Sequence, residues 1–286
     1  MEEFYNNRFC DCGKFLTLSD KRKRHQDIGT KEESVNDRYL GQRVKRILEF
    51  GESINSKDLV PVLIPEAADL IKNDPFAFLL AAVLDRGTKT EIIWTIPYYI
   101  KELLGDLNPS FFATASLDEL MELLQNIPAK PRYVSDAPRT MKQVALIVVN
   151  EFGGDTKKLW ENRSSRAVKG ILQRIYGVGP GIASMIVLLL EQWFKVQFND
   201  VDHQDMDVKP DVHVIRVFFR LGFISKADSQ TALNAARRLS PDYPGALDAP
   251  TWTIGRNWCS AYNPNCMDCP MGTSCPKILN EQSGGK

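Results

Sequence analysis

Hydrophobic residues recur at helical spacing along most of the chain. In SLDELMELLQNI, one face of a helix would be formed by Leu117, Leu120, Met121 and Leu124. Ser116 stands at the expected N-cap and Glu119 three residues later, which is the pattern of a capping box. The segment therefore predicts an amphipathic helix.

Three further segments predict helices of other kinds. AFLLAAVLDRG is apolar on nearly all sides, which predicts a buried helix that ends at Gly87. MKQVALIVVNEFGG ends in a glycine pair, and KADSQTALNAARRLSP is expected to start after Ser225 and stop before Pro241. VHVIRVFFRLGF fits either a helix or a strand. Convincing alternation of period two is otherwise absent from the sequence, so we predict an all-α fold.

Composition places the chain among ordinary globular proteins. It has 286 residues, of which 43% are hydrophobic, enough for a large core. The amino terminus begins acidic, and the most apolar run, MIVLLL at 185–190, is far shorter than a membrane span. We therefore expect no membrane association and an intracellular location, either cytoplasmic at the nucleoid or nuclear. Residues 1–60 are polar and predict an extension of unknown role.

Charge is balanced overall but uneven locally. The formal net charge is +0, which argues against a general polycation. Basic residues gather between 157 and 174, and acidic residues gather between 200 and 211. The acidic segment NDVDHQDMDVK, which includes Asp205 and Asp207, is typical of a solvated or cation-attracting loop.

Four cysteines stand close together near the carboxyl end, in CSAYNPNCMDCPMGTSC. In a reducing compartment such a cluster more often holds metal than disulfides. Cys259, Cys266, Cys269 and Cys275 have the spacing Cys-x6-Cys-x2-Cys-x5-Cys. Spacing alone fits either a tetrahedral zinc site or an iron-sulfur cluster. Cys10 and Cys12 are more typical of ordinary thiols.

The segment LQRIYGVGPGIASMIVLLL predicts a tight turn between two helices. Gly177, Gly179 and Gly181 let the backbone turn sharply and approach a partner closely. The amides that follow, near Val178 and Ile182, would lie at the positive end of a helix dipole, which suits a phosphate of DNA. The alternative is a glycine-rich connection between two core helices.

Three motifs together resemble a known family. LxxIxGVGPxxA resembles the helix-hairpin-helix of DNA glycosylases related to endonuclease III. PDVHVIR resembles the segment of that superfamily that carries an essential aspartate, with Asp211, His213 and Arg216 at the matching positions. The cysteine spacing, preceded by GRNWC, resembles the family's cluster loop, which implies a 4Fe-4S cluster with zinc as the alternative. The resemblance covers about residues 65–278.

The resemblance implies a two-lobed helical DNA glycosylase fold. Residues 81–199 would form a helical bundle with the hairpin, and residues 61–80 together with 200–286 would form the lobe of the iron-sulfur cluster. Asp211 would stand at the mouth of the cleft between the lobes. The implied partner is double-stranded DNA, bound by a monomer that extrudes a base into the cleft.

Two positions differ from the family pattern. Bifunctional members have a lysine in the hairpin turn, where this chain has Gly181, so we expect a monofunctional glycosylase that uses water. Many relatives insert a glutamine into the gap left by the base, where this chain has Arg86 and Gly87. Arg86 is expected to contact DNA, as a wedge or at a phosphate, or else to pair with Asp85.

The expected activity is base excision repair or removal of a modified base, with hydrolysis of the N-glycosidic bond at Asp211. One alternative is a noncatalytic protein that binds DNA lesions or modified bases. Another is a modification-dependent endonuclease or AP lyase. The sequence does not name the base, because pocket specificity depends on side chains scattered over several helices.

Overall fold

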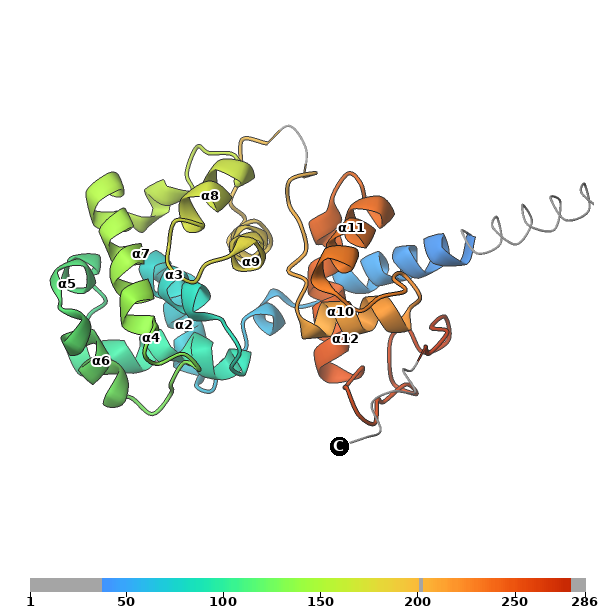
Figure 1. Cartoon of the computed structure of the whole chain (residues 1–286), viewed down its shortest axis with the longest axis horizontal. Helices are drawn as coiled ribbons and strands as arrows, with labels where there is room; N and C mark the ends of the chain where they lie inside the picture. The colour runs from blue at the N-terminus through green and yellow to red at the C-terminus, as the bar shows by residue number, and fades with distance from the viewer. Residues whose placement is uncertain (1–37, 201–202, 279–286) are drawn as a thin grey trace, which may run out of the picture.

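The computed structural model describes residues 38–200 and 203–278, and within them every regular element is a helix. The predicted all-α class is confirmed. In Figure 1 the helices form two groups, one from the middle of the chain and one mainly from its carboxyl end. The elements after the helical residues 38–52 are η1 (Ser56–Leu59), α2 (Pro65–Asn73), α3 (Pro75–Leu84), α4 (Thr90–Leu104), α5 (Pro109–Thr114), α6 (Leu117–Gln125), α7 (Ala137–Phe152), η2 (Thr156–Leu159), α8 (Ser165–Leu172), α9 (Pro180–Gln192), α10 (Val212–Arg220), α11 (Ser229–Leu239), η3 (Pro244–Leu247) and α12 (Asp248–Asn257).

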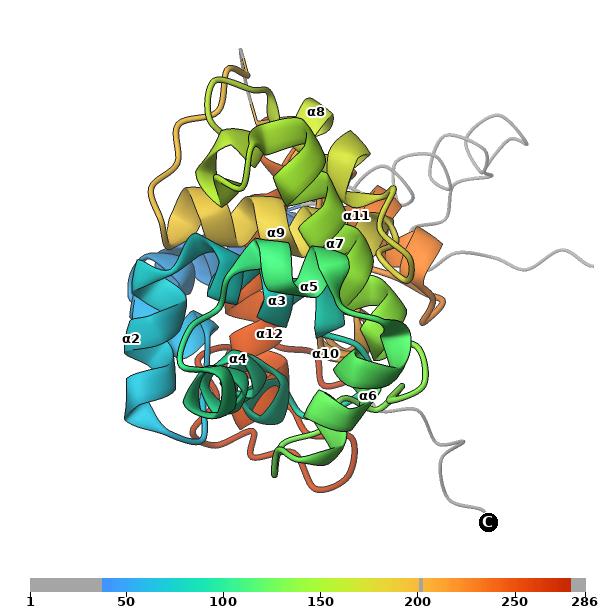
Figure 2. The same cartoon turned by 90° about the vertical axis from the view of Figure 1, so that its left-hand side faces the viewer.

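The larger lobe is a bundle built around α3. Asp74 caps this helix by accepting the amides of Phe76 and Ala77, and nine of its residues, from Phe76 to Leu84, are buried. Such a helix has no polar face, so it must be covered on all sides. It packs against α2, α4, α7 and α9, and Figure 2 shows the bundle from its outer end. The prediction of a buried helix in AFLLAAVLDRG is confirmed.

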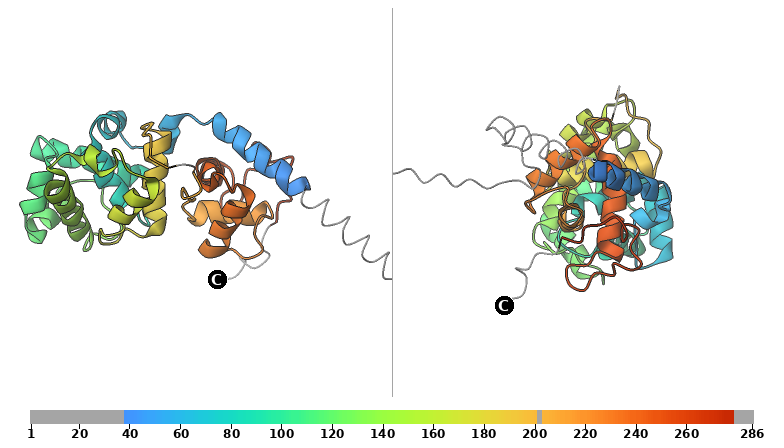
Figure 3. Two further views of the ribbon diagram at one scale, coloured as in Figure 1. Left: turned by 90° about the horizontal axis from the view of Figure 1, so that it is seen from above. Right: turned by 90° about the vertical axis from the view of Figure 1, so that its right-hand side faces the viewer.

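The smaller lobe has its own hydrophobic core. The core residues of α10, α11 and α12 pack with Val44 and Ile47 from the helical residues 38–52. Figure 3 shows this early helix lying along the outside of the carboxyl-terminal helices. Residues far apart in the sequence therefore share one core, separate from that of the bundle.

The lobe boundaries differ from those expected from the sequence. Residues 61–80 were expected in the lobe of the cysteines, but α2 packs on α3 and α4 and contributes Ile71 to the core of the bundle. The segment that joins the cysteine lobe from the amino-terminal side is the helix of residues 38–52, which was expected to be extension. Its apolar residues Val44 and Ile47 complete the smaller core. The earlier residues 1–37, with Cys10 and Cys12, lie outside the described residues.

Local signals account for most helix ends. The capping box at α6 is present, since Ser116 and Glu119 each accept from the other's backbone amide. VHVIRVFFR is helical, as α10, because Asp211 caps it and its apolar positions face α11 and α12. The helix expected after Ser225 begins later, at Ser229, because Asp228 accepts the amide of Thr231.

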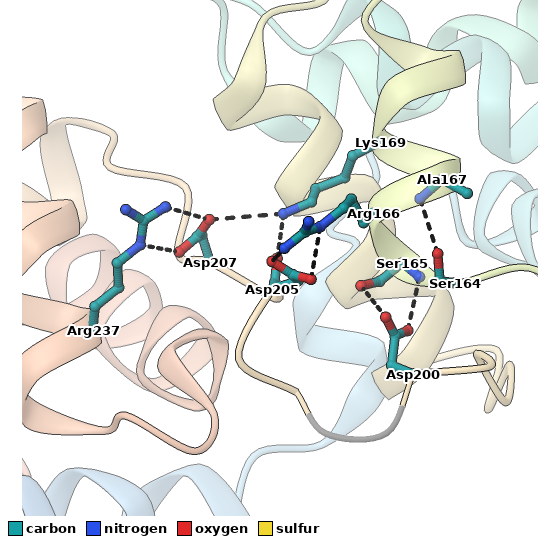
Figure 4. A network of polar contacts seen from close by, with 9 residues as sticks. All are labelled: Ser164, Ser165, Arg166, Ala167, Lys169, Asp200, Asp205, Asp207 and Arg237. Carbon is teal, nitrogen blue, oxygen red and sulfur yellow. Dashed lines mark hydrogen bonds and ion pairs between the residues drawn. The ribbon is translucent and has the colours of Figure 1, made fainter.

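The acidic segment between the lobes is held by ion pairs. Asp207 is buried, accepts two hydrogen bonds from Arg237 of α11 at 2.7 and 2.9 Å, and lies 3.7 Å from the amine of Lys169 of α8. Asp205 pairs with Arg166. Figure 4 shows these side chains between the two lobes. The prediction of a solvated loop is wrong for Asp207, because basic side chains of both lobes occupy its oxygens. Asp205 is still 41% exposed.

Candidate nucleic-acid interface and catalytic cleft

The glycine-rich turn connects α8 to α9 as predicted. Gly177 has a φ of +80°, a conformation that favours glycine. Gly179 is the N-cap of α9 and offers no side chain to the first amides of the helix. The amides of Gly181 and Ile182 therefore remain available to an outside acceptor. Val178 and Ile182 themselves are buried and anchor the turn to the bundle.

Arg86 lies directly behind this turn. Its guanidinium donates to Thr140 at 3.3 Å, and Tyr133 lies with its ring centre 5.5 Å from the guanidinium carbon. A Cβ at Gly177 would come within 1.9 Å of the guanidinium of Arg86, so a larger residue there would displace Arg86 as well as strain the backbone. Arg86 thus supports the turn from inside the bundle, and the buried Nε has no hydrogen-bond partner among the described residues.

Asp211 caps α10 of the smaller lobe. Its Oδ1 accepts hydrogen bonds from the backbone amides of His213 at 2.8 Å and Val214 at 3.0 Å. The partly buried side chain lines a cavity between the lobes, together with Met185, Leu188 and Gln192 of α9. The preceding Pro210 lies 3.9 Å from the position of a Cβ on Gly181. The structure therefore brings Asp211 and the hairpin helix to the two sides of one cavity.

Lys209 is a residue of this cavity that sequence reasoning missed. Its amine lies 3.2 Å from Asp85, at the end of α3, and 3.1 Å from the sulfur of Met185. Burial alone would lower the pKa of this amine, but Asp85, Asp211 and Asp248 outweigh burial and raise it. The only hint in the sequence was its place two residues before Asp211. The alternative pairing of Asp85 with Arg86 does not occur, since Asp85 pairs with Lys209.

Asp248 is the third carboxyl of the cavity. It begins α12 and accepts the backbone amide of Lys209 at 2.5 Å. Burial, followed by the negative charge of Asp211, raises the pKa of Asp248 to about 7, although the Lys209 amide and amine act in the opposite direction. Asp248 therefore changes charge near neutral pH.

His213 and Arg216 tie α10 to the rest of the smaller lobe. Arg216 bonds to the Nδ1 atom of His213 at 3.0 Å and to the carbonyl oxygens of Gly255 and Cys259 at 2.8 and 2.6 Å. These contacts join the capped start of α10 to α12 and to Cys259, the first of the four cysteines near the carboxyl end. His213 is thus held by structural contacts, as the interpretation of a structural histidine predicts.

The four cysteines of the carboxyl end line one small cavity. In the described part of the chain, no group of three or more His, Cys, Asp or Glu side chains is arranged to hold a metal ion. Burial raises the pKa of the Cys269 and Cys275 thiols. Arg220 donates to the sulfur of Cys259 at 3.3 Å, the type of contact that stabilises a thiolate.

Two arginines of the amino-terminal helix hold the cysteine loop. Arg46 donates to the carbonyl oxygen of Pro270 at 2.9 Å and to the hydroxyl of Thr273 at 2.7 Å. Arg43 donates to the carbonyl oxygens of Ser274 at 3.1 Å and Leu221 at 2.9 Å. These contacts span more than 170 residues of sequence, and no local pattern predicts them.

The hairpin, the facing carboxylate and the two helical lobes define the fold class of endonuclease III-like proteins. Endonuclease III of Thermotoga maritima is 24% identical to this chain over 205 residues, which are 71% of this chain and 84% of the relative. No protein-family model matches the chain.

Solved structures share this fold. A trapped covalent intermediate of endonuclease III with DNA has a TM-score of 0.53 at 19% identity and covers 74% of this chain and 92% of its own. A noncovalent endonuclease III–DNA complex has a TM-score of 0.53 at 20% identity and covers 74% and 91%. A thermostable thymine-DNA glycosylase has a TM-score of 0.55 at 17% identity and covers 85% and 97%. The predicted resemblance of this chain to the endonuclease III-like superfamily is confirmed.

Among the helices that the structure describes, none combines the length and the apolar character needed to cross a membrane.

Proposed function

We propose that this protein is a DNA glycosylase that removes a damaged, mismatched or modified base from double-stranded DNA. The position of Asp211 carries the proposal. This carboxylate lines the cavity between the lobes, and the preceding Pro210 lies 3.9 Å from the position of a Cβ on Gly181 of the hairpin. The similarity to endonuclease III supports the same class of substrate.

The hairpin would bind the DNA backbone beside the target nucleotide. The open amides at the start of α9 suit a phosphate oxygen, because they lie at the positive end of the helix dipole. The cavity volume of about 50 Å³ accommodates water but not a nucleobase. Entry of an extruded base therefore requires movement of the lobes or of the lining side chains.

Asp211 would act on the sugar of the extruded nucleotide. Positive charge develops on the sugar as the bond to the base breaks, and a nearby carboxylate stabilises that charge. Water then adds its oxygen to the anomeric carbon, and the departing base takes up a proton. The hydrogen bonds that Asp211 accepts from two backbone amides fix its carboxylate in place.

The enzyme is proposed to be monofunctional. Gly181 has no nucleophile, and a Cβ there would lie 3.7 Å from the side chain of Lys209. Hydrolysis would leave an abasic site with the strand intact. After a pure glycosylase has acted, the DNA strand breaks only when alkali is added. A modification-dependent endonuclease or AP lyase gives broken strands without alkali.

Cys259, Cys266, Cys269 and Cys275 are proposed to hold a 4Fe-4S cluster. The four cysteines line one cavity, and thiolates are the ligands of iron-sulfur clusters, with zinc as the alternative. A bound cluster would stabilise the loop, since ligand bonds substitute for a core that this short segment lacks. The chemistry at the base is assigned to the separate interlobe cavity.

Replacement of Asp211 by Asn tests the proposal. We expect base release from a panel of duplexes, each with one altered base, to fall by about 100-fold or more because the charge is lost. DNA binding should stay within about threefold, since Asn still caps a helix. Mass spectrometry of the free base provides the measurement and names the substrate.

The same variant separates the enzyme from a noncatalytic recognition protein. The wild-type form of such a protein would release no base. Its Asp211→Asn variant would bind altered DNA as well as the wild type does. Release at the wild-type rate by Asp211→Asn would contradict the assignment of Asp211.

A further inference from the structure

Lys209 reaches into the cavity from the side opposite the hairpin. Its stem passes over Gly181, with Cγ 3.7 Å from the position of a Cβ on that glycine. Its amine continues to Met185, one turn further along α9, and to Asp85. The face of α9 that lacks a side chain at Gly181 is therefore covered by a lysine from the smaller lobe.

Both ends of Lys209 are anchored. The backbone amide donates to Asp248 of α12, and the side-chain amine pairs with Asp85 of the bundle. The lysine thus connects one lobe to the other immediately before Asp211. Any shift of residues 209–211 would break one of these two contacts.

The charges around the cavity are predominantly negative. Asp85, Asp211 and Asp248 are its carboxyl groups, and Lys209 has the one positive charge among the described residues that line it. Arg216, further along α10, adds a weaker interaction with Asp211. A cation beside such a group of carboxyls offsets their mutual repulsion.

An amine in this place has two possible roles, as a nucleophile or as a fixed cation. A nucleophile must be neutral at the moment of attack. The three carboxylates raise the pKa of the Lys209 amine and favour its charged form. The ion pair with Asp85 also holds the amine toward the bundle. Both observations favour the fixed cation.

We propose that Lys209 is a positioning residue that holds Asp211 in place, by bridging the lobes between Asp85 and Asp248. The inference rests on the proposed glycosylase function. Lys209 lies outside the three sequence motifs. It gives the cleft a positive charge although the hairpin turn has Gly181 instead of a lysine.

The test compares Lys209→Met, which removes the charge, with Lys209→Arg, which keeps it. Lys226→Met is the matched control, because Lys226 is 82% exposed and belongs to the same lobe. Single-turnover base release is measured from pH 5 to 9 on a duplex that wild type cleaves, with DNA binding measured in parallel. Melting curves establish that each variant folds.

We expect Lys209→Met to slow base release by roughly 100-fold, with DNA binding within about threefold of wild type. Its pH profile should shift to higher pH, because the Lys209 amine lowers the pKa of the neighbouring Asp248 and this effect is lost. Lys209→Arg should recover at least about tenfold of the lost rate. A purely structural lysine would leave the pH profile unchanged.

Each other outcome has a defined meaning. If wild type releases no base from any duplex, the proposed function fails. If wild type is active and Lys209→Met matches it in rate and pH profile, this inference fails alone. Borohydride trapping of wild type that disappears in Lys209→Met would make Lys209 a nucleophile and overturn the proposal. If Lys209→Met does not fold, Lys209→Gln replaces it with the same expected results.

Discussion

At the residue scale, the cavity between the lobes is unusual for the number of ionisable groups it combines. Asp211 and Asp248 each stand at the start of a helix, at α10 and α12, and Lys209 bonds to Asp248 through its backbone. Helix starts attract carboxylates because of the open amides and the dipole. Two such helix starts at one cavity place two carboxyl groups close together, which raises the cost of ionising both.

Asp248 should make stability depend on pH. Its pKa is about 7 in the folded protein against an ordinary value of 3.8, so between these values the folded state holds a proton that the unfolded state releases. Stability therefore falls as pH rises from about 4 to 7. Asp248→Asn should remove this decline and stabilise the protein at pH 8 by on the order of 2 kcal/mol.

Urea unfolding of wild type and Asp248→Asn at several pH values measures this difference. The two proteins should converge at low pH, where Asp248 is protonated in both states. A constant difference between them at every pH would show that the charge of Asp248 is not its cause.

At the element scale, the helix of residues 38–52 completes the smaller lobe. It supplies Val44 and Ile47 to the core, and its outward arginines hold the cysteine loop. Residues 38–52 of the expected amino-terminal extension are thus part of the smaller lobe. The loop itself has few apolar residues, so contacts from outside it matter for its order.

Arg46→Ala should loosen the cysteine loop. The loss of the bonds to Pro270 and Thr273 is expected to cost about 1 kcal/mol locally, because both bonds are exposed to water. Hydrogen exchange of the amides at 266–275 should become about fivefold faster, a ratio equivalent to that energy. Lys45→Ala is the control, since Lys45 is 78% exposed and pairs with Glu49 of the same helix. Equal exchange in both variants would contradict the assignment.

At the scale of the whole molecule, the acidic segment is a strap between the lobes. Asp207 accepts from Arg237 of the smaller lobe and lies beside Lys169 of the bundle, as Figure 4 shows. The cavity with Asp211 lies between the same lobes. The strap therefore limits how far the two sides of the cavity can separate.

Asp207→Asn should destabilise the protein by roughly 2 kcal/mol, because Lys169 and Arg237 lose a partner whose side chain is only 12% exposed. The control is Asp205→Asn, which breaks the more exposed pair with Arg166 and should cost less than about 1 kcal/mol. Urea unfolding measures both. Equal losses in the two variants would contradict a special role for Asp207.

The sequence by itself determined what depends on short spacing. Helix periodicity, the capping box at Ser116, the glycines of the hairpin and the cysteine spacing are local patterns, and they sufficed for the fold class and for the resemblance. Asp211 was also identified locally, since its motif is contiguous with the helix that it caps. In each case the physical cause lies within a few residues of the chain.

Only the tertiary structure decided which distant residues share a surface. The place of residues 38–52, the pairing of Asp207 with Arg237 and the approach of Lys209 to Gly181 and Asp85 all depend on how two cores pack and connect. A charged residue looks the same in the sequence whether its side chain is exposed to water or pairs with a residue of another lobe. Burial decides between them, and burial is a property of the folded chain.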